Sequence, residues 1–185
     1  MQSLLGNLRK DKLKIYTNLS NYLSGNLAEV GVYRGGSAEI IANAKFSEKK
    51  LYLFDTFDGM PQVHENDNFC KQGDFGETSY EQVKNGLRHF NNVFVYKGVF
   101  PQQNSSFIEN EQFALVHIDV DIYQSYKDCL EFFYPRMVHG GIMVLDDYNH
   151  EKCIGAKIAT DEFLKDKKEK LVWSMFSQIC LIKQC

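Results

Sequence analysis

The chain has 185 residues, of which 44% are hydrophobic and 24% charged, with a formal net charge of −3. This length and composition are typical of one soluble globular domain. The slightly acidic balance argues against a nucleic-acid-binding protein, which normally carries a basic surface. No apolar run approaches the ~20 residues that cross a bilayer, and the first ten residues lack the apolar stretch of a signal peptide. We therefore expect a cytoplasmic protein that binds neither nucleic acid nor membrane.

The cysteines point to the same compartment. The chain has five of them, and no two are separated by the two residues of a CxxC motif: Cys70, Cys129, Cys153, Cys180 and Cys185. An odd count without that spacing argues against a disulfide framework or a structural zinc site. Reduced thiols in a cytoplasm are the simplest interpretation.

Hydrophobic periodicity predicts alternating helices and strands along the chain. Residues 4–23 have apolar side chains at helical spacing. Helices are also expected over 37–44, 78–90, 123–138 and 154–164. The helix at 78–90 would begin with a capping box from Thr78 to Glu81, and the helix at 123–138 would be stopped by Gly140 and Gly141. Short apolar runs predict strands at 26–33, 51–54, 93–96, 113–118 and 142–145. Residues 171–176 and 179–183 predict a terminal hairpin.

This alternation predicts an α/β fold in which a largely parallel sheet is covered on both faces and the hairpin adds an antiparallel edge. We expect an N-terminal helical segment at residues 1–24 and the main domain at 25–185. The N-terminal helix could pack on its own core or on a partner chain, so a homo-oligomer is possible. The polar stretch at 58–77 is long for a loop in a compact domain, which favours a lid. In open sheets of this type, ligands bind beyond the carboxyl ends of the strands.

The first two predicted strands end in residues suited to a nucleoside. Glu29 and Gly31 begin an ExGxxxG motif, in which Gly31 allows a sharp turn and a close approach of ligand to backbone. Asp55, 24 residues after Gly31, ends the second strand, where a carboxylate can accept hydrogen bonds from both ribose hydroxyls. A plain tight turn and a turn-capping aspartate are the alternatives.

Four aspartates follow two later strands. Asp119 and Asp121 end the strand at 113–118, and Asp146 and Asp147 end the strand at 142–145. If those strands are neighbours, the carboxylates crowd together and raise one another's pKa, unless a cation binds them. Oxygen ligands favour Mg²⁺, Ca²⁺ or Mn²⁺ over zinc. The alternative is a set of turn and cap carboxylates.

Three histidines are considered for positions in or around the site. We interpret His117 as a packing histidine on the face opposite Val116, and His150 as a residue flanking the acidic site. His64 falls in the predicted lid and, with Tyr123 and Tyr148, is a candidate for the acceptor pocket.

Several segments, taken in order, resemble the macrocin O-methyltransferase family. The segments that carry the resemblance run through most of the chain: Glu29–Ser37, Leu53–Pro61, Gly98–Pro101, His117–Tyr123, Gly140–Tyr148 and Cys153–Phe163. The resemblance implies a class I methyltransferase fold, a Rossmann-like three-layer sandwich with strand order 3-2-1-4-5-7-6. It also implies S-adenosylmethionine as the methyl donor and a Mg²⁺ ion or another divalent cation.

The resemblance assigns roles to residues. Those that would contact the donor are Glu29, Gly31, Tyr33, Ser37, Asp55, Gly98, Val99 and Asp119, with Asp55 on the ribose and Gly98 and Val99 beside the adenine. Those that would bind the metal are Asp119, Asp146 and Asp147. Asp121 matches a general base proposed in part of the family, whereas other members use a histidine where this chain has Ile122. Family members usually have a longer N-terminal region than the 25 residues before the first strand here.

The expected activity is therefore metal-dependent O-methylation of a small molecule that carries hydroxyl groups, such as a sugar or another polyol. An NAD-dependent oxidoreductase and a metal-dependent hydrolase on a related fold are the alternative enzymes. A binding module that keeps the fold without catalysis is the third alternative.

Overall fold

The computed structural model describes residues 1–184, without the side chains of residues 173–175. Its centre is a seven-stranded sheet in the order β3-β2-β1-β4-β5-β7-β6, which confirms the expected fold and strand order. The strands are β1 (Asn26–Val30), β2 (Leu51–Asp55), β3 (Val93–Lys97), β4 (Phe113–Ile118), β5 (Met137–Leu145), β6 (Leu171–Met175) and β7 (Gln178–Ile182). The first five are parallel, and β7 is antiparallel to both β5 and β6.

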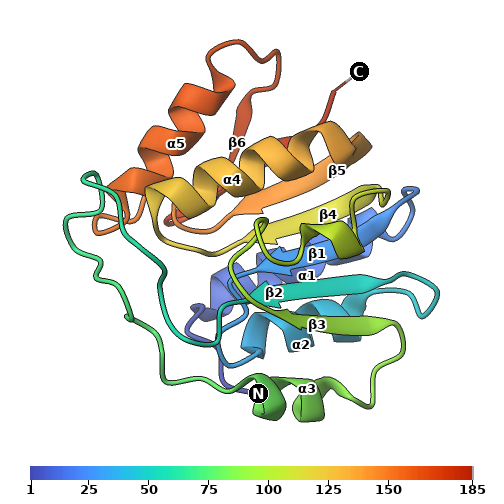
Figure 1. Cartoon of the computed structure of the whole chain (residues 1–185). Coiled ribbons are helices and arrows are strands. Elements are labelled where there is room, and N and C mark those ends of the chain that lie inside the picture. Colours follow the sequence, from blue (N-terminus) through green and yellow to red (C-terminus); the bar gives the residue numbers. More distant parts are fainter. Residues whose placement is uncertain (185) are drawn as a thin grey trace.

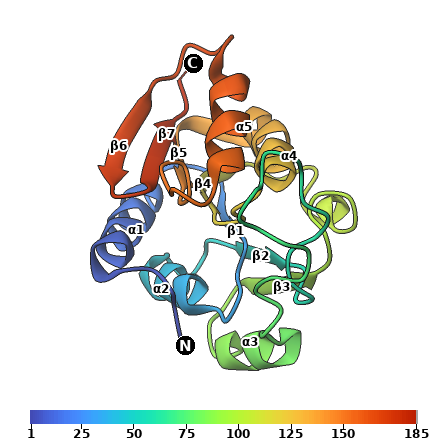
Figure 2. The same ribbon diagram turned by 90° about the vertical axis from the view of Figure 1, so that its left-hand side faces the viewer.

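Helices cover both faces of the sheet, as Figures 1 and 2 show. The helices are α1 (Asn7–Ser20), α2 (Gly36–Ala44), α3 (Tyr80–Leu87), α4 (Tyr123–Phe133) and α5 (Ile154–Leu164). The first three lie on one face and α4 and α5 on the other. Each face has its own apolar core, because successive side chains of a strand point to opposite faces.

The N-terminal helix packs into one of these cores. Leu5 and Leu13 belong to the same buried cluster as Leu27 and Ile41, and α1 lies against α2. The opposite side of α1 exposes Leu8, among other apolar side chains. A homo-oligomer therefore stays a prediction.

Several helix boundaries differ from the expected ones; α1, for example, covers Asn7–Ser20 instead of 4–23, and two of the differences have a clear physical cause. The helix expected over 123–138 ends at Phe133, because Pro135 lacks the N–H that a longer helix needs, and a 3₁₀ turn leads directly into β5. Gly140 and Gly141 therefore lie inside β5 instead of ending a helix. They sit beside an irregularity in the pairing of β4 with β5, where Gly140 has a φ of +78°.

The start of α3 is the second difference. Ser79 is its N-cap and accepts a hydrogen bond from the backbone N–H of Gln82 at 3.4 Å. The hydroxyl of Thr78, expected as the cap, donates to the carbonyl of Tyr33. The hydroxyl of Thr78 therefore makes a long-range hydrogen bond to Tyr33 instead of capping α3.

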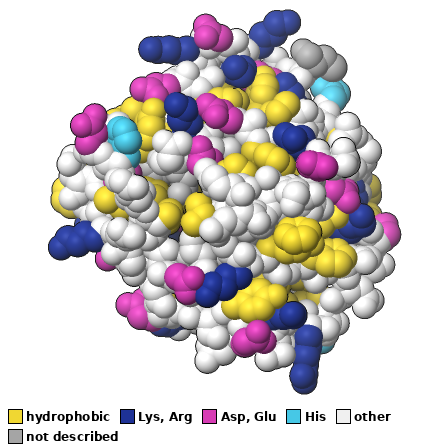
Figure 3. Space-filling model, in the orientation of Figure 1, with side chains coloured by type: hydrophobic (Ala, Val, Ile, Leu, Met, Phe, Trp, Pro, Cys, Tyr) yellow, Lys and Arg dark blue, Asp and Glu magenta, His cyan; other side chains and the backbone are white. Residues whose placement is uncertain are grey.

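Four of the cysteines are free thiols, and Cys185 lies outside the described residues. Within residues 1–184, no helix combines the length and apolar character needed to cross a bilayer. On the face shown in Figure 3, acidic and basic side chains are interspersed with apolar ones.

Candidate functional site

The carboxyl ends of the parallel strands lie level with one another, and a cavity of about 350 Å³ opens there. Backbone hydrogen bonds continue one residue past the strands. Gly31 donates to Phe54 at 2.9 Å, and Asp119 donates to Val30 at 3.0 Å. Asp146 donates to the carbonyl of Ile118 at 3.0 Å. The residues that follow β1, β4 and β5 are therefore held in one row, beside the end of β2, at the edge that faces the viewer in Figure 2.

Nearly all of the predicted site residues line this cavity: Gly31, Tyr33, Ser37, Asp55, Gly98, Val99, Asp119, Asp121, Asp146 and Asp147. His150 lines it as well. Glu29 does not; its side chain is fully buried, and its Oε1 lies 2.9 Å from Nδ1 of His117. Its Oε2 accepts no hydrogen bond from residues 1–184.

Gly31 is required by protein packing. It has a φ of +91°, and a Cβ placed there would lie 1.8 Å from the carbonyl oxygen of Asp119. No side chain fits at that distance. The glycine therefore lets the end of β1 lie against the end of β4, and it brings the two halves of the site together.

Asp55 is held by backbone hydrogen bonds. Its Oδ2 accepts from the N–H of Tyr33 and its Oδ1 from the N–H of Phe57, both at 2.7 Å. Tyr33 has a φ of +50°, a conformation that costs about 1–3 kcal/mol and is common at functional sites. Each carboxylate oxygen has a second lone pair, so Asp55 can still accept hydrogen bonds from hydroxyls in the cavity.

Three carboxylates meet at the other end of the cavity. Oxygens of Asp119, Asp146 and Asp147 lie within 4.8 Å of one another. Asp146 and Asp147 are only 1% and 4% exposed. Burial, reinforced by the neighbouring carboxylates, raises the pKa of Asp119 and Asp147 well above the ordinary value.

Asp146 behaves differently because cations lie beside it. Burial by itself would raise its pKa, but His117 and Arg9 lower it. Burial would likewise lower the pKa of His117, but Asp146 and Glu29 hold it well above the ordinary value. His117 is fully buried, with its Nε2 3.8 Å from Asp146 Oδ1. It packs as predicted on the face opposite Val116, and it also supplies a positive charge between two carboxylates.

Asp121 follows β4 with a φ of +59° and is fixed on two sides. Its N–H donates to Asp147 Oδ2 at 3.0 Å, and its Oδ1 accepts from the thiol of Cys153 at 3.2 Å. Burial and nearby carboxylates raise the pKa of Cys153, so the thiol stays protonated and acts as a donor. Burial also raises the pKa of Asp121 itself, which makes it a stronger base.

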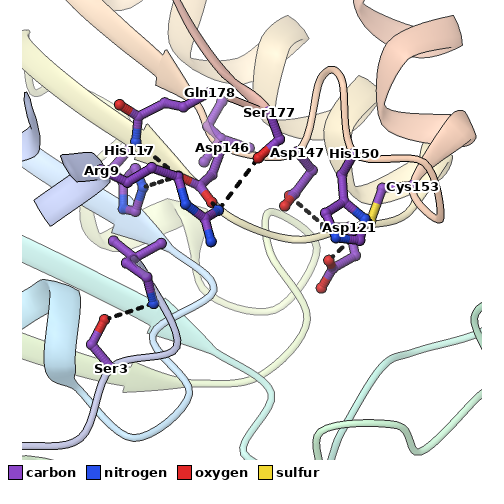
Figure 4. A network of polar contacts seen from close by, with 12 residues as sticks. Ser3, Arg9, His117, Asp121, Asp146, Asp147, His150, Cys153, Ser177 and Gln178 are labelled. Carbon is purple, nitrogen blue, oxygen red and sulfur yellow. Dashed lines mark hydrogen bonds and ion pairs between the residues drawn. The ribbon is translucent and has the colours of Figure 1, made fainter. Parts of the chain in front are cut away.

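Three polar residues of the site were not anticipated, and Figure 4 shows them around Asp146. Arg9 of α1 pairs with Asp146 Oδ2, and Gln178 donates to Asp146 Oδ1 at 2.8 Å. The hydroxyl of Ser177 lies 3.4 Å from the Arg9 guanidinium. Arg9 stands among several lysines in sequence and carries no local signal. Gln178 could have been suspected, because the predicted hairpin turn must lie near the end of a neighbouring strand.

The segment at 58–77 lines the cavity at two places, through residues 59–61 and 74–75. Between them, Asp67 anchors the segment to α4, because its buried carboxylate accepts from the N–H of Tyr123 at 2.9 Å. The ring of His64 stacks on that of Tyr123. The hydroxyl of Tyr148 contacts Asp161. None of these three aromatic side chains is part of the cavity wall.

The residues present suit both a divalent cation and a nucleoside. The three carboxylates are an all-oxygen ligand set of the kind that Mg²⁺, Ca²⁺ and Mn²⁺ prefer. Buried like charges without a cation raise one another's pKa, and two of the three do so here. At the opposite end, Asp55 is preorganised, and Gly98 and Val99 line the cavity. The cavity can therefore hold a nucleoside next to a metal ion.

Comparison with known proteins agrees with this arrangement. The macrocin-O-methyltransferase (TylF) family model matches residues 2–177. A tetracenomycin-C rhamnosyl 4'-O-methyltransferase from Streptomyces olivaceus is 27% identical over 168 residues, which cover 82% of this chain and 64% of that protein. Demethyldecarbamoylnovobiocin O-methyltransferase from Streptomyces niveus is 26% identical over 160 residues, covering 78% and 60%. The chain thus spans less than two thirds of the length of these relatives.

Solved structures show the same fold. The O-methyltransferase NovP has a TM-score of 0.86 at 22% identity, with 99% of this chain and 82% of that chain covered. An O-methyltransferase from Bacillus cereus, in complex with SAH, has a TM-score of 0.69 at 13% identity, with 97% and 82% covered. The family match spans nearly all of the sequence, so the chain belongs to the macrocin-O-methyltransferase family.

Proposed function

We propose that this chain transfers a methyl group from S-adenosylmethionine to a hydroxyl of a polyhydroxylated small molecule, with a sugar as the favoured acceptor, and that a divalent cation such as Mg²⁺ assists. The observation that carries the proposal is a single cavity with the preorganised carboxylate of Asp55 at one end and three clustered carboxylates at the other. The relatives, named for methylation of rhamnosyl and novobiocin compounds, favour a sugar-linked acceptor.

The donor would lie along the ends of β1, β2 and β3. Asp55 would accept hydrogen bonds from the ribose hydroxyls, since both of its oxygens face backbone donors that fix their direction. Gly98 and Val99 would border the base, and Ser37, at the start of α2, would lie near the amino-acid part. Glu29 is fully buried outside the cavity wall, so a contact with the donor would require its unpartnered Oε2 to become accessible.

The cation would bind Asp119, Asp146 and Asp147. Five carboxylates are gathered in this region, counting Glu29 and Asp121, and the positive groups beside them are His117 and Arg9. A divalent cation would offset most of the remaining negative charge. When bound, the donor supplies an activated methyl group, and the cation lowers the pKa of a coordinated hydroxyl.

The chain's own residues would align the acceptor and remove its proton. Asp121 would accept that proton, a contribution typically of about 10²–10⁴-fold. The carboxylate of Asp121 is held in position by two hydrogen bonds. Its Oδ1 accepts from the thiol of Cys153, and the backbone N–H of Asp121 donates to Asp147. The segment at 58–77 would exclude water from the site, and its wall residues at 59–61 and 74–75 are already in place.

An NAD-dependent oxidoreductase and a metal-dependent hydrolase fit less well. The first needs a GxGxxG turn, which the ExGxxxG motif around Gly31 does not provide. A metal-dependent hydrolase would have no role for Asp55, although two backbone N–H groups preorganise its carboxylate. Calorimetric titration with S-adenosylhomocysteine and with NAD distinguishes the methyltransferase from the oxidoreductase, because we expect only S-adenosylhomocysteine to bind.

Methyl transfer is the direct test. The protein is incubated with S-adenosylmethionine and a panel of rhamnosides, other glycosides and catechols, with Mg²⁺ or with EDTA, and S-adenosylhomocysteine is quantified by mass spectrometry. We expect turnover that EDTA reduces at least tenfold and that Asp121→Asn reduces about a hundredfold. Asp166→Asn, an exposed carboxylate on the same chain, is the control. Full turnover in EDTA would reject the cation's role, and donor binding without transfer to any acceptor would favour a binding module.

A further inference from the structure

Arg9 links the N-terminal helix to the acidic cluster. Its guanidinium pairs with Asp146 Oδ2 and lies 3.4 Å from the hydroxyl of Ser177. The Arg9 side chain is 21% exposed and lines the cavity, whereas Asp146 is 1% exposed. Figure 4 shows the guanidinium between the loop that carries Asp146 and the N-terminal segment. A charged group from the first ten residues therefore enters the site.

Arg9 contacts the oxygen of Asp146 that has fewer other polar contacts, which is the one more open to a metal ion. Asp146 Oδ1 already accepts from Gln178 at 2.8 Å and faces His117 Nε2 at 3.8 Å. Asp146 Oδ2 contacts only Arg9 among the polar contacts of the described residues. Asp147, by comparison, accepts from neutral donors, the hydroxyl of Tyr126 and a backbone N–H. Arg9 thus supplies a positive charge at the position where a cation ligated by Asp146 would lie.

The residues that precede Arg9 lie against the donor end of the cavity. The amino group of Met1 pairs with Glu39 of α2. A Cβ on Gly36 would meet the backbone of Gln2 at 2.5 Å and the side chain of Ser3 at 2.3 Å. Residues 2–5 contribute to the cavity wall. The pair between Arg9 and Asp146 is therefore one of the contacts that hold the segment covering the first turn of α2.

We propose that Arg9 is an exchangeable counter-ion: it holds Asp146 in the cation-free protein, and a divalent cation bound to Asp119, Asp146 and Asp147 displaces it. This rests on the cation site of the proposed function. A guanidinium compensates one carboxylate, while a divalent cation contacts three. The two positive charges repel each other strongly at contact distance in a poorly solvated site. Cation binding would then loosen residues 1–9 over the donor end of the cavity.

Cation affinity measured without donor or acceptor tests this. Mn²⁺ is titrated calorimetrically into the wild type, Arg9→Ala, Arg9→Lys and Lys14→Ala. Lys14 is exposed on the same helix, so its loss removes an equal charge away from the site. Removing a charge-assisted hydrogen bond that competes with the ion should tighten Mn²⁺ binding about tenfold or more in Arg9→Ala. Arg9→Lys should be intermediate, and Lys14→Ala should stay within about twofold of wild type.

Hydrogen exchange gives a second measurement that does not depend on turnover. In the wild type, Mn²⁺ should speed amide exchange in residues 1–10, whereas in Arg9→Ala that exchange should be fast with or without the ion. Equal or weaker Mn²⁺ affinity in Arg9→Ala would overturn the proposal and leave the cation site intact. Absence of Mn²⁺ binding in all four proteins would overturn both, and the methyl-transfer assay in EDTA would then show whether transfer survives.

Discussion

The two ends of the cavity are built on different physical principles. At the ends of β1, β2 and β3, the carboxylate of Asp55 is satisfied by two backbone N–H groups, and the chain around it is fixed by glycines and tight turns. At the ends of β4 and β5, four carboxylates are gathered with two compensating cations, Arg9 and His117. The first half is complete as the protein folds, whereas the second half is short of positive charge.

This difference separates shape from charge. A site made by backbone geometry should be indifferent to salt, metal and pH, and should respond to changes in the chain's conformation. A site made by clustered charges should respond to cations and protons, and isosteric changes to neutral residues should weaken cation binding while stabilising the cation-free fold. The four predictions that follow test this contrast.

Gly31→Ala should have the largest effect, because Gly31 joins the two halves. Its Cβ would lie 1.8 Å from the Asp119 carbonyl oxygen, and its φ is +91°. We expect the free energy of unfolding in urea to fall by roughly 3–5 kcal/mol, from overpacking and backbone strain together. Gly73→Ala is the matched control, with a φ of +89° and nothing within 4 Å, and should lose only about 1–2 kcal/mol. Equal losses would show that the close approach of the two strands does not matter.

Asp55→Ala should remove donor binding without touching the cation site. We expect the affinity for S-adenosylhomocysteine to fall about a hundredfold, because the ribose hydroxyls of the bound nucleoside would lose their charged hydrogen-bond acceptor. Mn²⁺ affinity should stay within about twofold of wild type. Asp58→Ala, three residues further and exposed, should change neither in the same calorimetric titrations. A parallel loss of cation affinity would mean that the two halves are not separate.

Asp147→Asn should do the reverse. Mn²⁺ affinity should fall about tenfold or more, because one anionic ligand is lost. S-adenosylhomocysteine binding in EDTA should be unchanged. The cation-free variant should also unfold at a higher temperature than wild type, because the like-charge repulsion on Asp119 is reduced. Thermal denaturation in EDTA measures this, with Asp166→Asn as the control; a lower unfolding temperature would contradict it.

The smallest effect should be a pH-dependent stabilisation by cations. The pKa values of Asp119, Asp121 and Asp147 are raised in the folded protein. Their contribution to stability is therefore present below the unfolded pKa and is lost as pH rises through the folded values. Asp146, with a lowered pKa, acts in the opposite direction. Mg²⁺ should thus raise the melting temperature by a few degrees at pH 8 and by much less at pH 5. An equal shift at both pH values would argue against the carboxylates as its ligands.

The sequence by itself determined the elements, their order and the residues at the strand ends. Apolar runs of strand length are a local feature of the sequence, and the carboxyl ends of parallel strands share one edge of the sheet. The sequence therefore predicts that Asp55, Asp119 and Asp146 lie along the same edge. The family resemblance added the strand order, which local periodicity does not contain. Boundaries were weaker: Thr78 was expected to cap α3, and Gly140 to end a helix.

Only the tertiary structure decided which side chains neutralise one another. Arg9 is one basic residue among several on α1, and nothing in its neighbourhood distinguishes it until α1 packs beside β5. The same holds for Gln178, and for His117, whose charge depends on carboxylates from two other strands. Gly31 lines the cavity, and only the tertiary structure shows that the carbonyl of Asp119 leaves no room for a side chain there. Local sequence patterns specify backbone conformation, whereas electrostatic partners are set by distances between segments far apart in the chain, and those exist only in the folded protein.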